Sequence, residues 1–331
     1  MTTARCHGTA VSASLDAAFT RKPCLRLIQR LSTWLLVALG GLAWSMPVAA
    51  NDPHVLVLGR VSDDPKAHYE QLKPLLDYIV PRMADVGITE GRILMAGDLQ
   101  QMSSYLRRGR VDWVTETSAN AMRLQERADA VPLLLTERDG VSSYRSLAFA
   151  RRDSGIRSLP GLRGHSIAFQ NTSSTSAYVV PAVELLQSGL PMQLLLSPMD
   201  KPDPRAVGYL FAGSELNIAT WVHKGLVDAG TMSNLDWENP LRMPPSYRRD
   251  LVVIARSEPY PRALEMVRGD LDARIRERLR EVLLEAGNDP DAREALQRFF
   301  RTTRFLPVDR DTQAALRELA AGVSRVRAEV E

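Results

Sequence analysis

From residue 54 onward, short apolar runs alternate with longer segments whose apolar residues recur at helical spacing. The first run is His54–Gly59, and the segment that follows it, Tyr69–Met83, has apolar residues three or four positions apart. Further along, Arg92–Ala96 and Val111–Thr115 have the composition of strands and flank a helical segment at Leu99–Arg108. Strands that alternate with helices of this length build sheets in which the strands run mostly parallel. We therefore expect an α/β fold with a largely parallel sheet.

A short pattern occurs twice and indicates that the chain forms two similar halves. Tyr105–Asp112 and Trp221–Asp228 each combine a helix end, a basic residue, a glycine and then Val-Asp at the start of a strand. Glycine suits this position because it can close a helix in the left-handed backbone conformation. We expect Gly109 and Gly225 to end equivalent helices in two lobes of similar topology.

Two apolar segments mark where the chain passes between these lobes. Ser146–Ala150 leaves the first lobe and Leu251–Ala255 returns to it. We therefore assign residues 51–147 and 250–331 to lobe 1 and residues 148–249 to lobe 2. Lobe 2 needs strands and helices of its own, which we place at Ser166–Phe169, Ser174–Gln187, Leu216–His223 and Val227–Thr231. Helices with one apolar face complete lobe 1 at the C-terminus.

The first 50 residues differ in kind from the rest. Basic residues between Arg21 and Arg30 precede an apolar stretch, Leu31–Trp44, which is followed by Met46–Ala50 with small residues at its end. This order is typical of a secretory signal peptide. The apolar stretch is shorter than the roughly 20 residues that a membrane-spanning helix needs, and an uncleaved membrane anchor is the alternative. We expect residues 1–50 to be removed and the mature protein to be periplasmic.

Removal of this leader changes what the composition implies. Both cysteines, Cys6 and Cys24, lie in it, so the mature chain has no thiol for a disulfide, a lipid anchor, a nucleophile or a metal site. The leader also holds 5 of the 42 Lys and Arg residues and 1 of the 39 Asp and Glu residues, which leaves a net charge of −1. A chain this close to neutral gives no reason to expect nucleic acid as a partner.

Hydroxyl residues are crowded onto the turn between the Ser166–Phe169 strand and the next helix. Thr172–Ser176 consists only of Ser and Thr. The start of a helix leaves about four backbone N–H groups unpaired and carries roughly half a positive charge, so it can bind an anion. Hydroxyls from the same turn would add hydrogen-bond donors. We expect an anion-binding turn; the alternative is one capping hydroxyl followed by a polar loop.

Several motifs then occur in a recognisable order along the mature chain: Asp139-Gly140, Tyr144–Ser146, Asp153–Ile156, Ser158-Leu159, Leu162–Gly164, Phe169, Ser173–Tyr178, Pro181 and Gly225–Gly230. Together they resemble the PhnD family, the periplasmic solute-binding proteins of phosphonate, phosphite and phosphate ABC importers. The resemblance covers essentially the whole mature chain. It implies a type II periplasmic-binding-protein fold, in which two α/β lobes joined by two crossover strands close on the ligand.

The resemblance also implies which residues bind that ligand. The family's phosphonate-binding hydroxyls match Ser174, Thr175 and Ser176, and a tyrosine donor near the crossover matches Tyr144. A second family tyrosine, from the start of the helix after the second strand, falls at Leu99, which cannot donate a hydrogen bond.

Carboxylates show a similar departure from the family pattern. The two that hold the ammonium group of aminoethylphosphonate in other members fall near Leu235 and Ala263, so the resemblance implies a phosphorus oxyanion without an amino group. Glu215 stands where many members have a histidine. We expect Glu215 and Glu116 to face the ligand, where each could accept a hydrogen bond from a protonated ligand oxygen or pair with an arginine such as Arg145; the alternative is that both are surface glutamates.

No combination of residues suggests catalysis. The sequence has neither a Gly-x-Ser-x-Gly nucleophile motif nor a Gly-x-x-x-x-Gly-Lys phosphate loop, and no histidines of the mature chain have metal-ligand spacing. We expect no enzyme activity, cofactor or metal. The protein would be a monomer that delivers a small anion to an ABC permease in the inner membrane. A sensor of the same fold that signals to a membrane receptor or kinase is one alternative, and a periplasmic enzyme acting on phosphate esters is another.

Overall fold

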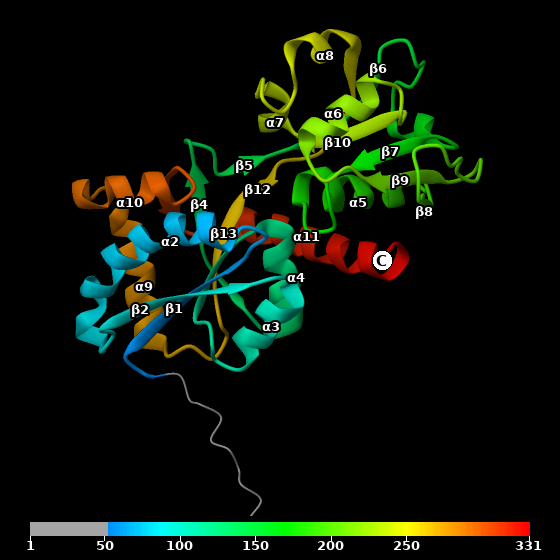
Figure 1. The fold of residues 1–331 in the computed structure, drawn as a ribbon. Helices are drawn as coiled ribbons and strands as arrows, with labels where there is room; N and C mark the ends of the chain where they lie inside the picture. Colours follow the sequence, from blue (N-terminus) through cyan, green and yellow to red (C-terminus); the bar gives the residue numbers. More distant parts are fainter. Residues whose placement is uncertain (1–51) are drawn as a thin grey trace, which may run out of the picture. The chain divides into compact units, whose positions relative to one another are not determined.

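A computed structural model describes residues 52–331 of the chain (Figure 1). The expected leader, residues 1–50, lies outside the described residues. None of the helices within residues 52–331 is long and apolar enough to cross a membrane. This part of the chain forms two six-stranded sheets, on which we base lobe 1 and lobe 2, and a two-stranded sheet.

Lobe 1 contains a mixed sheet with the strand order β14-β4-β13-β3-β1-β2. β1 pairs in parallel with β2 and with β3, as the alternation of strands and helices predicts. β13 is inserted between β3 and β4 and runs antiparallel to both, because the chain enters this strand directly from lobe 2 without a crossover helix. The expectation of a largely parallel sheet is therefore wrong for this half of the sheet. The bounds are β1 Val55–Val61, β2 Glu90–Ala96, β3 Trp113–Thr117, β4 Val131–Arg138, β13 Ala263–Val267 and β14 Thr302–Leu306.

Lobe 2 contains the second sheet, with the order β11-β6-β10-β7-β9-β8. Its last four strands are parallel, whereas β6 runs antiparallel to β10 and β11. Because β11 belongs to this sheet, lobe 2 extends past the boundary that we expected at residue 250. The bounds are β6 Ser146–Arg151, β7 Ser166–Phe169, β8 Met192–Leu194, β9 Val207–Phe211, β10 Ala229–Ser233 and β11 Leu251–Arg256.

The repeated sequence pattern has the same structural role in both lobes. Gly109 and Gly225 follow helices and adopt φ angles of 63° and 71°, in the left-handed region. Three residues after each glycine, an aspartate accepts a hydrogen bond from a neighbouring strand: Asp112 from Val57 N at 2.8 Å and Asp228 from Ser166 N at 2.9 Å. The pattern therefore ties a helix end to the start of a neighbouring strand in each lobe.

The chain crosses between the lobes at a two-stranded antiparallel sheet, β5 (Ser143–Tyr144) and β12 (Tyr260–Pro261). Tyr144 lies opposite Tyr260, and their ring centroids are 4.7 Å apart. We call this pair of segments the hinge.

Helices precede or follow most strands. In lobe 1 they are α2 Pro65–Ile79, η1 Val80–Val86, α3 Leu99–Arg107, α4 Ser118–Ala128, α9 Ala273–Ala286, η4 Pro290–Ala292 and α10 Arg293–Arg298. In lobe 2 they are η2 Leu159–Leu162, η3 Thr175–Val179, α5 Val180–Gln187, α6 Glu215–His223, α7 Asn234–Glu238 and α8 Pro245–Asp250.

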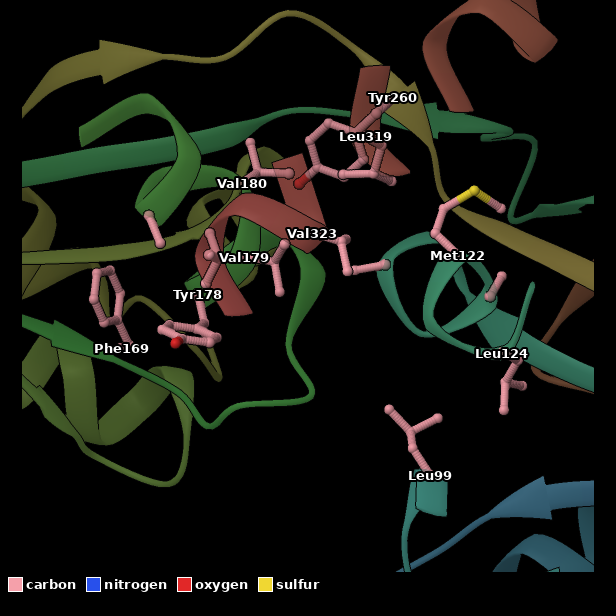
Figure 2. Packing of buried hydrophobic residues seen from close by; sticks show 14 of the residues in the cluster. Leu99, Met122, Leu124, Phe169, Tyr178, Val179, Val180, Tyr260, Leu319 and Val323 are labelled. Atoms are coloured by element: carbon pink, nitrogen blue, oxygen red, sulfur yellow. The ribbon is translucent and has the colours of Figure 1, made fainter. Parts of the chain in front are cut away.

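The C-terminal helix α11 (Arg310–Glu329) contacts both lobes, since it packs against α4 of lobe 1 and α5 of lobe 2. Figure 2 shows Leu319 and Val323 of this helix among buried residues from both sides, with Val179 and Val180 on one side and Met122 of α4 on the other. One apolar cluster thus runs from α4 through α11 to the helix that follows the hydroxyl-rich turn.

Candidate functional site

A cavity of about 470 Å³ is lined by residues of lobe 1, lobe 2 and the hinge. Six helical segments, α2, α3, α4, η3, α6 and α7, each contribute residues at or beside their first turn. This arrangement follows from the fold, because helices that follow parallel strands begin at the carboxyl ends of those strands. Helix starts bring partial positive charge and backbone N–H donors, so the cavity is electrostatically suited to an anion.

The hydroxyl-rich turn forms part of the cavity wall in lobe 2. Ser174 is the N-cap of η3, and its hydroxyl accepts a hydrogen bond from Ala177 N at 3.1 Å. Thr175 and Ser176 are buried and line the same cavity without serving as the cap. The capping alternative is therefore right for Ser174 alone, and two hydroxyls of the turn remain for another purpose.

Pro181 explains the shape of this turn. η3 is one turn of π-helix, and Pro181 follows it at the start of α5. Proline has no N–H, so it cannot bond to the Ala177 carbonyl four residues earlier. That carbonyl instead accepts hydrogen bonds from Gln170 N at 3.1 Å and from Thr231 Oγ1 at 3.0 Å. These bonds tie the turn to the end of β7 and to β10.

Tyr144 reaches the hydroxyl-rich turn from the hinge. Burial raises the pKa of Tyr144 to about 12, although the neighbouring Ser176 hydroxyl acts in the opposite direction. The phenol therefore keeps its proton throughout the neutral range and can act as a hydrogen-bond donor. Ser146, just past the hinge, donates from its hydroxyl to the Ser176 carbonyl at 2.6 Å and so fixes the turn against β6.

The start of α4 forms the opposing wall in lobe 1. Thr117 is at the N-cap position of α4 but its side chain makes no capping hydrogen bond, and within the described chain its buried Oγ1 has no partner. Ala119 N donates to Thr175 Oγ1 at 3.1 Å, so the two lobes meet at this point. The sequence analysis missed Thr117 and Asn120, which both line the cavity. The signal was present, because Thr117-Ser118 stands at the start of a helix that comes after a strand, as Thr175-Ser176 does.

The two predicted glutamates line the cavity, but both are engaged. Glu116 is buried, and its carboxylate accepts hydrogen bonds from Val61 N at 3.3 Å, Thr117 N at 3.2 Å and Asn120 Nδ2 at 3.0 Å. It therefore holds the end of β1 against the start of α4. Neither glutamate is an exposed surface residue, since Glu215 is also buried.

Glu215 pairs with Arg242, whose Nη1 is 2.9 Å from its Oε2. Burial, followed by the negative charge of Asp236, raises the pKa of Glu215. Glu215 thus pairs with an arginine, which was one of its two expected roles, but this arginine is Arg242 and not Arg145, the example named. Arg145 instead donates to the Ser257 carbonyl at 2.7 Å and lies 3.8 Å from Glu258.

The three positions that depart from the family pattern differ in their surroundings. Leu235 lines the cavity. Leu99 is buried in the apolar cluster that includes Met102 and Leu106 (Figure 2), and Ala263 is completely buried at the start of β13. None of these side chains can donate or accept a hydrogen bond.

Basic residues of lobe 1 also line the cavity, and the sequence analysis did not single them out. They are Arg60 at the end of β1, Arg262 next to the hinge and His68 in the first turn of α2. His68 Nδ1 is 2.6 Å from Ser62 Oγ, and burial, followed by the charge of Arg60, lowers the pKa of His68. No group of His, Cys, Asp or Glu residues within 52–331 has the geometry of a metal site.

Comparisons with known proteins bear on this geometry. The model of a family described as the periplasmic substrate-binding protein of phosphonate ABC transporters matches residues 59–313. The chain belongs to this family. The phosphonate-binding family consists of transporter components that bind a substrate in the periplasm, and it is not a family of enzymes.

Among solved structures, XAC2383 from Xanthomonas citri is similar to this chain. Its structure bound to a chloride ion is 56% identical in sequence, with a TM-score of 0.80, and the match covers 84% of this chain and 100% of XAC2383. The same protein bound to ATP is 55% identical, with the same TM-score of 0.80 and the same coverage.

A more distant relative is PhnD1 of Prochlorococcus marinus (strain MIT 9301), described as a probable ABC transporter phosphite binding protein. It is 22% identical over 205 residues, which are 59% of this chain and 66% of PhnD1, just under two thirds of that relative. The structure of PhnD1 with methylphosphonate matches at 17% identity and a TM-score of 0.59, over 83% of this chain and all of PhnD1. This likeness confirms the type II periplasmic-binding-protein fold.

Proposed function

We propose that the mature protein is a periplasmic solute-binding protein that captures a small phosphorus oxyanion and delivers it to an ABC permease of the inner membrane. The contact between Thr175 Oγ1 and Ala119 N carries this proposal, because it brings the starts of η3 and α4 from different lobes to one point of the cavity. An anion at that point interacts with two positive helix ends at once. It therefore stabilises the closed arrangement of the lobes by its greater affinity for that arrangement.

Each predicted site residue has a role in this proposal. Thr175, Ser176 and Tyr144 donate hydrogen bonds to the oxyanion, and Ser174 fixes the turn as its N-cap. Glu215, with its raised pKa, accepts a hydrogen bond from a protonated ligand oxygen or donates one when it is itself protonated. Glu116 acts indirectly by holding the start of α4.

The relatives support an anionic ligand that contains phosphorus. Chloride and ATP, which are named for XAC2383, are both anions, and PhnD1 was solved with methylphosphonate. A protein with this role must reach the periplasm, and the leader at residues 1–50 supplies the export signal.

A thermal-shift screen of the mature protein tests the proposal. The ligands are phosphate, phosphite, methylphosphonate, aminoethylphosphonate and sulfate. A ligand at 100 times its dissociation constant stabilises the folded state by about 2.7 kcal/mol, which is easily measured as a rise in melting temperature. We expect a rise with at least one phosphorus oxyanion and a smaller one with sulfate. If none of the phosphorus compounds stabilises the protein, the proposal is wrong.

A sensor role is the second candidate, and the buried Leu99 is the observation that favours it. Leu99 stands where the importers that this chain resembles have a tyrosine that donates a hydrogen bond from lobe 1. Transport does not require the loss of this donor. A strain that lacks the protein separates the two roles. Loss of uptake of a labelled ligand supports delivery to an importer, whereas normal uptake with a lost transcriptional or signalling response supports the sensor.

A further inference from the structure

Three arginines from separate segments of lobe 1 come together beside the cavity, and two of them line it. Arg60 is the second-to-last residue of β1, Arg138 ends β4 and Arg262 lies between β12 and β13. Arg262 Nη1 donates to the Arg138 carbonyl at 2.7 Å. The guanidinium carbons of Arg60 and Arg138 lie 4.8 Å and 4.5 Å from the ring centroid of Phe300. We call Arg60, Arg138 and Arg262 the guanidinium cluster.

Phe300 is held in an unusual conformation to make these contacts. Phe300 and the next residue, Arg301, have φ angles of 54° and 57°. Residues with side chains rarely adopt this left-handed conformation, and two in succession are rarer still. The ring thereby offers both guanidinium groups a cation–π contact, which partly replaces lost hydration.

Arg138 has donors that no group within residues 52–331 uses. The residue is only 9% exposed, and within the described chain its Nε and Nη2 have no hydrogen-bond partner. Burial, followed by the charge of Arg60, lowers the pKa of Arg138 to about 10. Arg60 also has an unused donor, since its Nε is buried without a hydrogen-bond partner among residues 52–331. Buried, unpaired charge of this kind is costly unless something else compensates it.

The carboxylates near the cluster already serve other groups. Glu265 is completely buried and accepts hydrogen bonds from Trp113 Nε1 at 2.6 Å, Thr115 Oγ1 at 2.9 Å and Thr136 Oγ1 at 2.6 Å. Glu116 comes no closer than 3.9 Å to Arg60.

The other two carboxylates that act on Arg262 are also engaged. Asp139 pairs with Arg301 at 3.0 Å, and Asp236 accepts from Ser233 Oγ at 2.5 Å. Within residues 52–331, the cluster therefore keeps unused N–H donors on Arg60 and Arg138.

The guanidinium cluster reaches the cavity of the hydroxyl-rich turn through two of its three members, and the third, Arg138, lies with Arg60 at the ring of Phe300. Arg60 and Arg262 line that cavity together with Thr175 and Ser176. Tyr144 lies next to Ser176, and the charge of Arg262 acts on its phenol, which places Arg262 near the same hinge tyrosine. If a ligand bound at the turn carries a second anionic group, the guanidinium cluster is available to bind that group.

We propose that the ligand carries two anionic groups, a phosphoryl group joined by a short bridge to a second phosphoryl or carboxylate group. This inference rests on the proposed function. The first group binds at Thr175 and Ser176 in lobe 2, and the second binds to the guanidinium cluster in lobe 1. Arginine suits this task because its planar fork of N–H donors matches the oxygens of phosphate and carboxylate groups. The second anion also supplies the lobe 1 contact that the family tyrosine makes at the position of Leu99.

Titration calorimetry on the mature protein at fixed pH and salt tests this inference. The ligands are pyrophosphate and phosphonoacetate, which have two anionic ends, and methylphosphonate, which has one. We expect one of the two-ended ligands to bind at least tenfold more tightly than methylphosphonate. If pyrophosphate binds more tightly, the second group is a phosphoryl group. If phosphonoacetate binds more tightly, the second group is a carboxylate.

Variants show whether the guanidinium cluster causes this preference. We expect Arg60→Gln and Arg262→Gln each to reduce the ratio of the two affinities about tenfold. The matched control is Arg92→Gln, which removes an exposed arginine of the same lobe that pairs with Glu90, and which should keep the ratio. Arg262→Lys, which retains the charge, is the second variant to use if a Gln variant fails to fold, and circular dichroism checks folding.

The failures of the two proposals are distinguishable. Equal affinity for one-ended and two-ended ligands, or an unchanged ratio in the folded cluster variants, overturns this inference and leaves the proposed function intact. Absence of binding to all three compounds overturns this inference, and the proposed function falls with it only if the phosphorus compounds of the thermal-shift screen also fail to stabilise the protein.

Discussion

The hydroxyls of the turn have separate tasks. Ser174 caps η3, whereas Thr175 accepts from Ala119 N and keeps its own hydrogen for a ligand oxygen. Tyr144 contributes a phenol whose pKa burial raises to about 12, so it stays a donor at any pH at which the protein is used. Under the proposed function, these residues decide the affinity for the phosphoryl group.

We expect Thr175→Ala and Tyr144→Phe each to weaken phosphorus-oxyanion binding about tenfold, which corresponds to about 1.4 kcal/mol. Each change removes one hydrogen bond to a charged group, and such bonds contribute about 1.5–3 kcal/mol. Calorimetry gives the dissociation constants. Thr172→Ala is the matched control, because Thr172 belongs to the same run of hydroxyls but is exposed and does not line the cavity. Unchanged affinity in both variants would exclude the turn as the binding site.

Single residues could be predicted from the sequence where the chemistry is local. The hydroxyl-rich turn is local in this sense, since the strand, the hydroxyls and the helix follow one another. The basic side of the cavity is not, because Arg60, Arg138 and Arg262 come from three distant segments that lie close together only after the sheet has formed. A sequence pattern could not show that these three arginines lie together. For the same reason it could not show that the partner of Glu215 is Arg242.

At the scale of single elements, the π-turn at η3 depends on one missing N–H group. Because Pro181 has no N–H to donate, the Ala177 carbonyl is free to accept from Gln170 N and Thr231 Oγ1. The position of Thr175 and Ser176 against β10 follows from those two bonds. The element that binds is therefore shaped by a residue that does not line the cavity.

We expect Pro181→Ala to weaken oxyanion binding severalfold while the melting temperature stays nearly the same. The new N–H can bond to the Ala177 carbonyl, which favours a regular α-helix through the turn and competes with the bonds to Gln170 and Thr231. Calorimetry and thermal melting are measured on the same samples. Pro160→Ala is the control, because Pro160 starts η2 on the exposed surface of the same lobe. An affinity equal to that of the unchanged protein would show that the turn does not need the proline.

Elements whose bounds depend on local periodicity agree closely with the sequence analysis. β7 spans Ser166–Phe169 as expected, and the two glycines of the repeated pattern end α3 and α6 in the same way. The pairing of β13 could not be predicted, because it is set by where the chain re-enters lobe 1 and not by the alternation of apolar residues within the strand. The order of strands in a sheet depends on where the returning chain joins that sheet. The lobe boundary that we expected at residue 250 was misplaced for this reason.

At the scale of the whole molecule, the segments that connect the lobes meet behind the hinge. A cavity of about 160 Å³ there is lined by residues of α5, α11 and the segment that enters β12, among them Glu184, Glu258, Tyr260 and Leu319. Burial, followed by the negative charge of Glu258, raises the pKa of Glu184 from 4.5 to about 7. Tyr260 faces the same carboxylate, and burial in this region raises its own pKa. A proton on Glu184 therefore changes the charge where α5, α11 and the segment that enters β12 meet.

The sign of the resulting pH dependence follows from proton binding. Glu184 has a pKa of 4.5 in the unfolded chain and about 7 in the folded protein, so between these values the folded state holds a proton that the unfolded state has released. The contribution of this group to stability is complete below the lower value and is lost as the pH rises through the higher one. We expect the free energy of unfolding, from urea titrations at a series of pH values, to fall over this window, and Glu184→Gln to remove that part of the decline. Glu318→Gln takes a carboxylate from the same cavity and should retain it. If the decline persists in Glu184→Gln, another group titrates over this range of pH. The protonation of Glu184 then does not cause the pH dependence of stability.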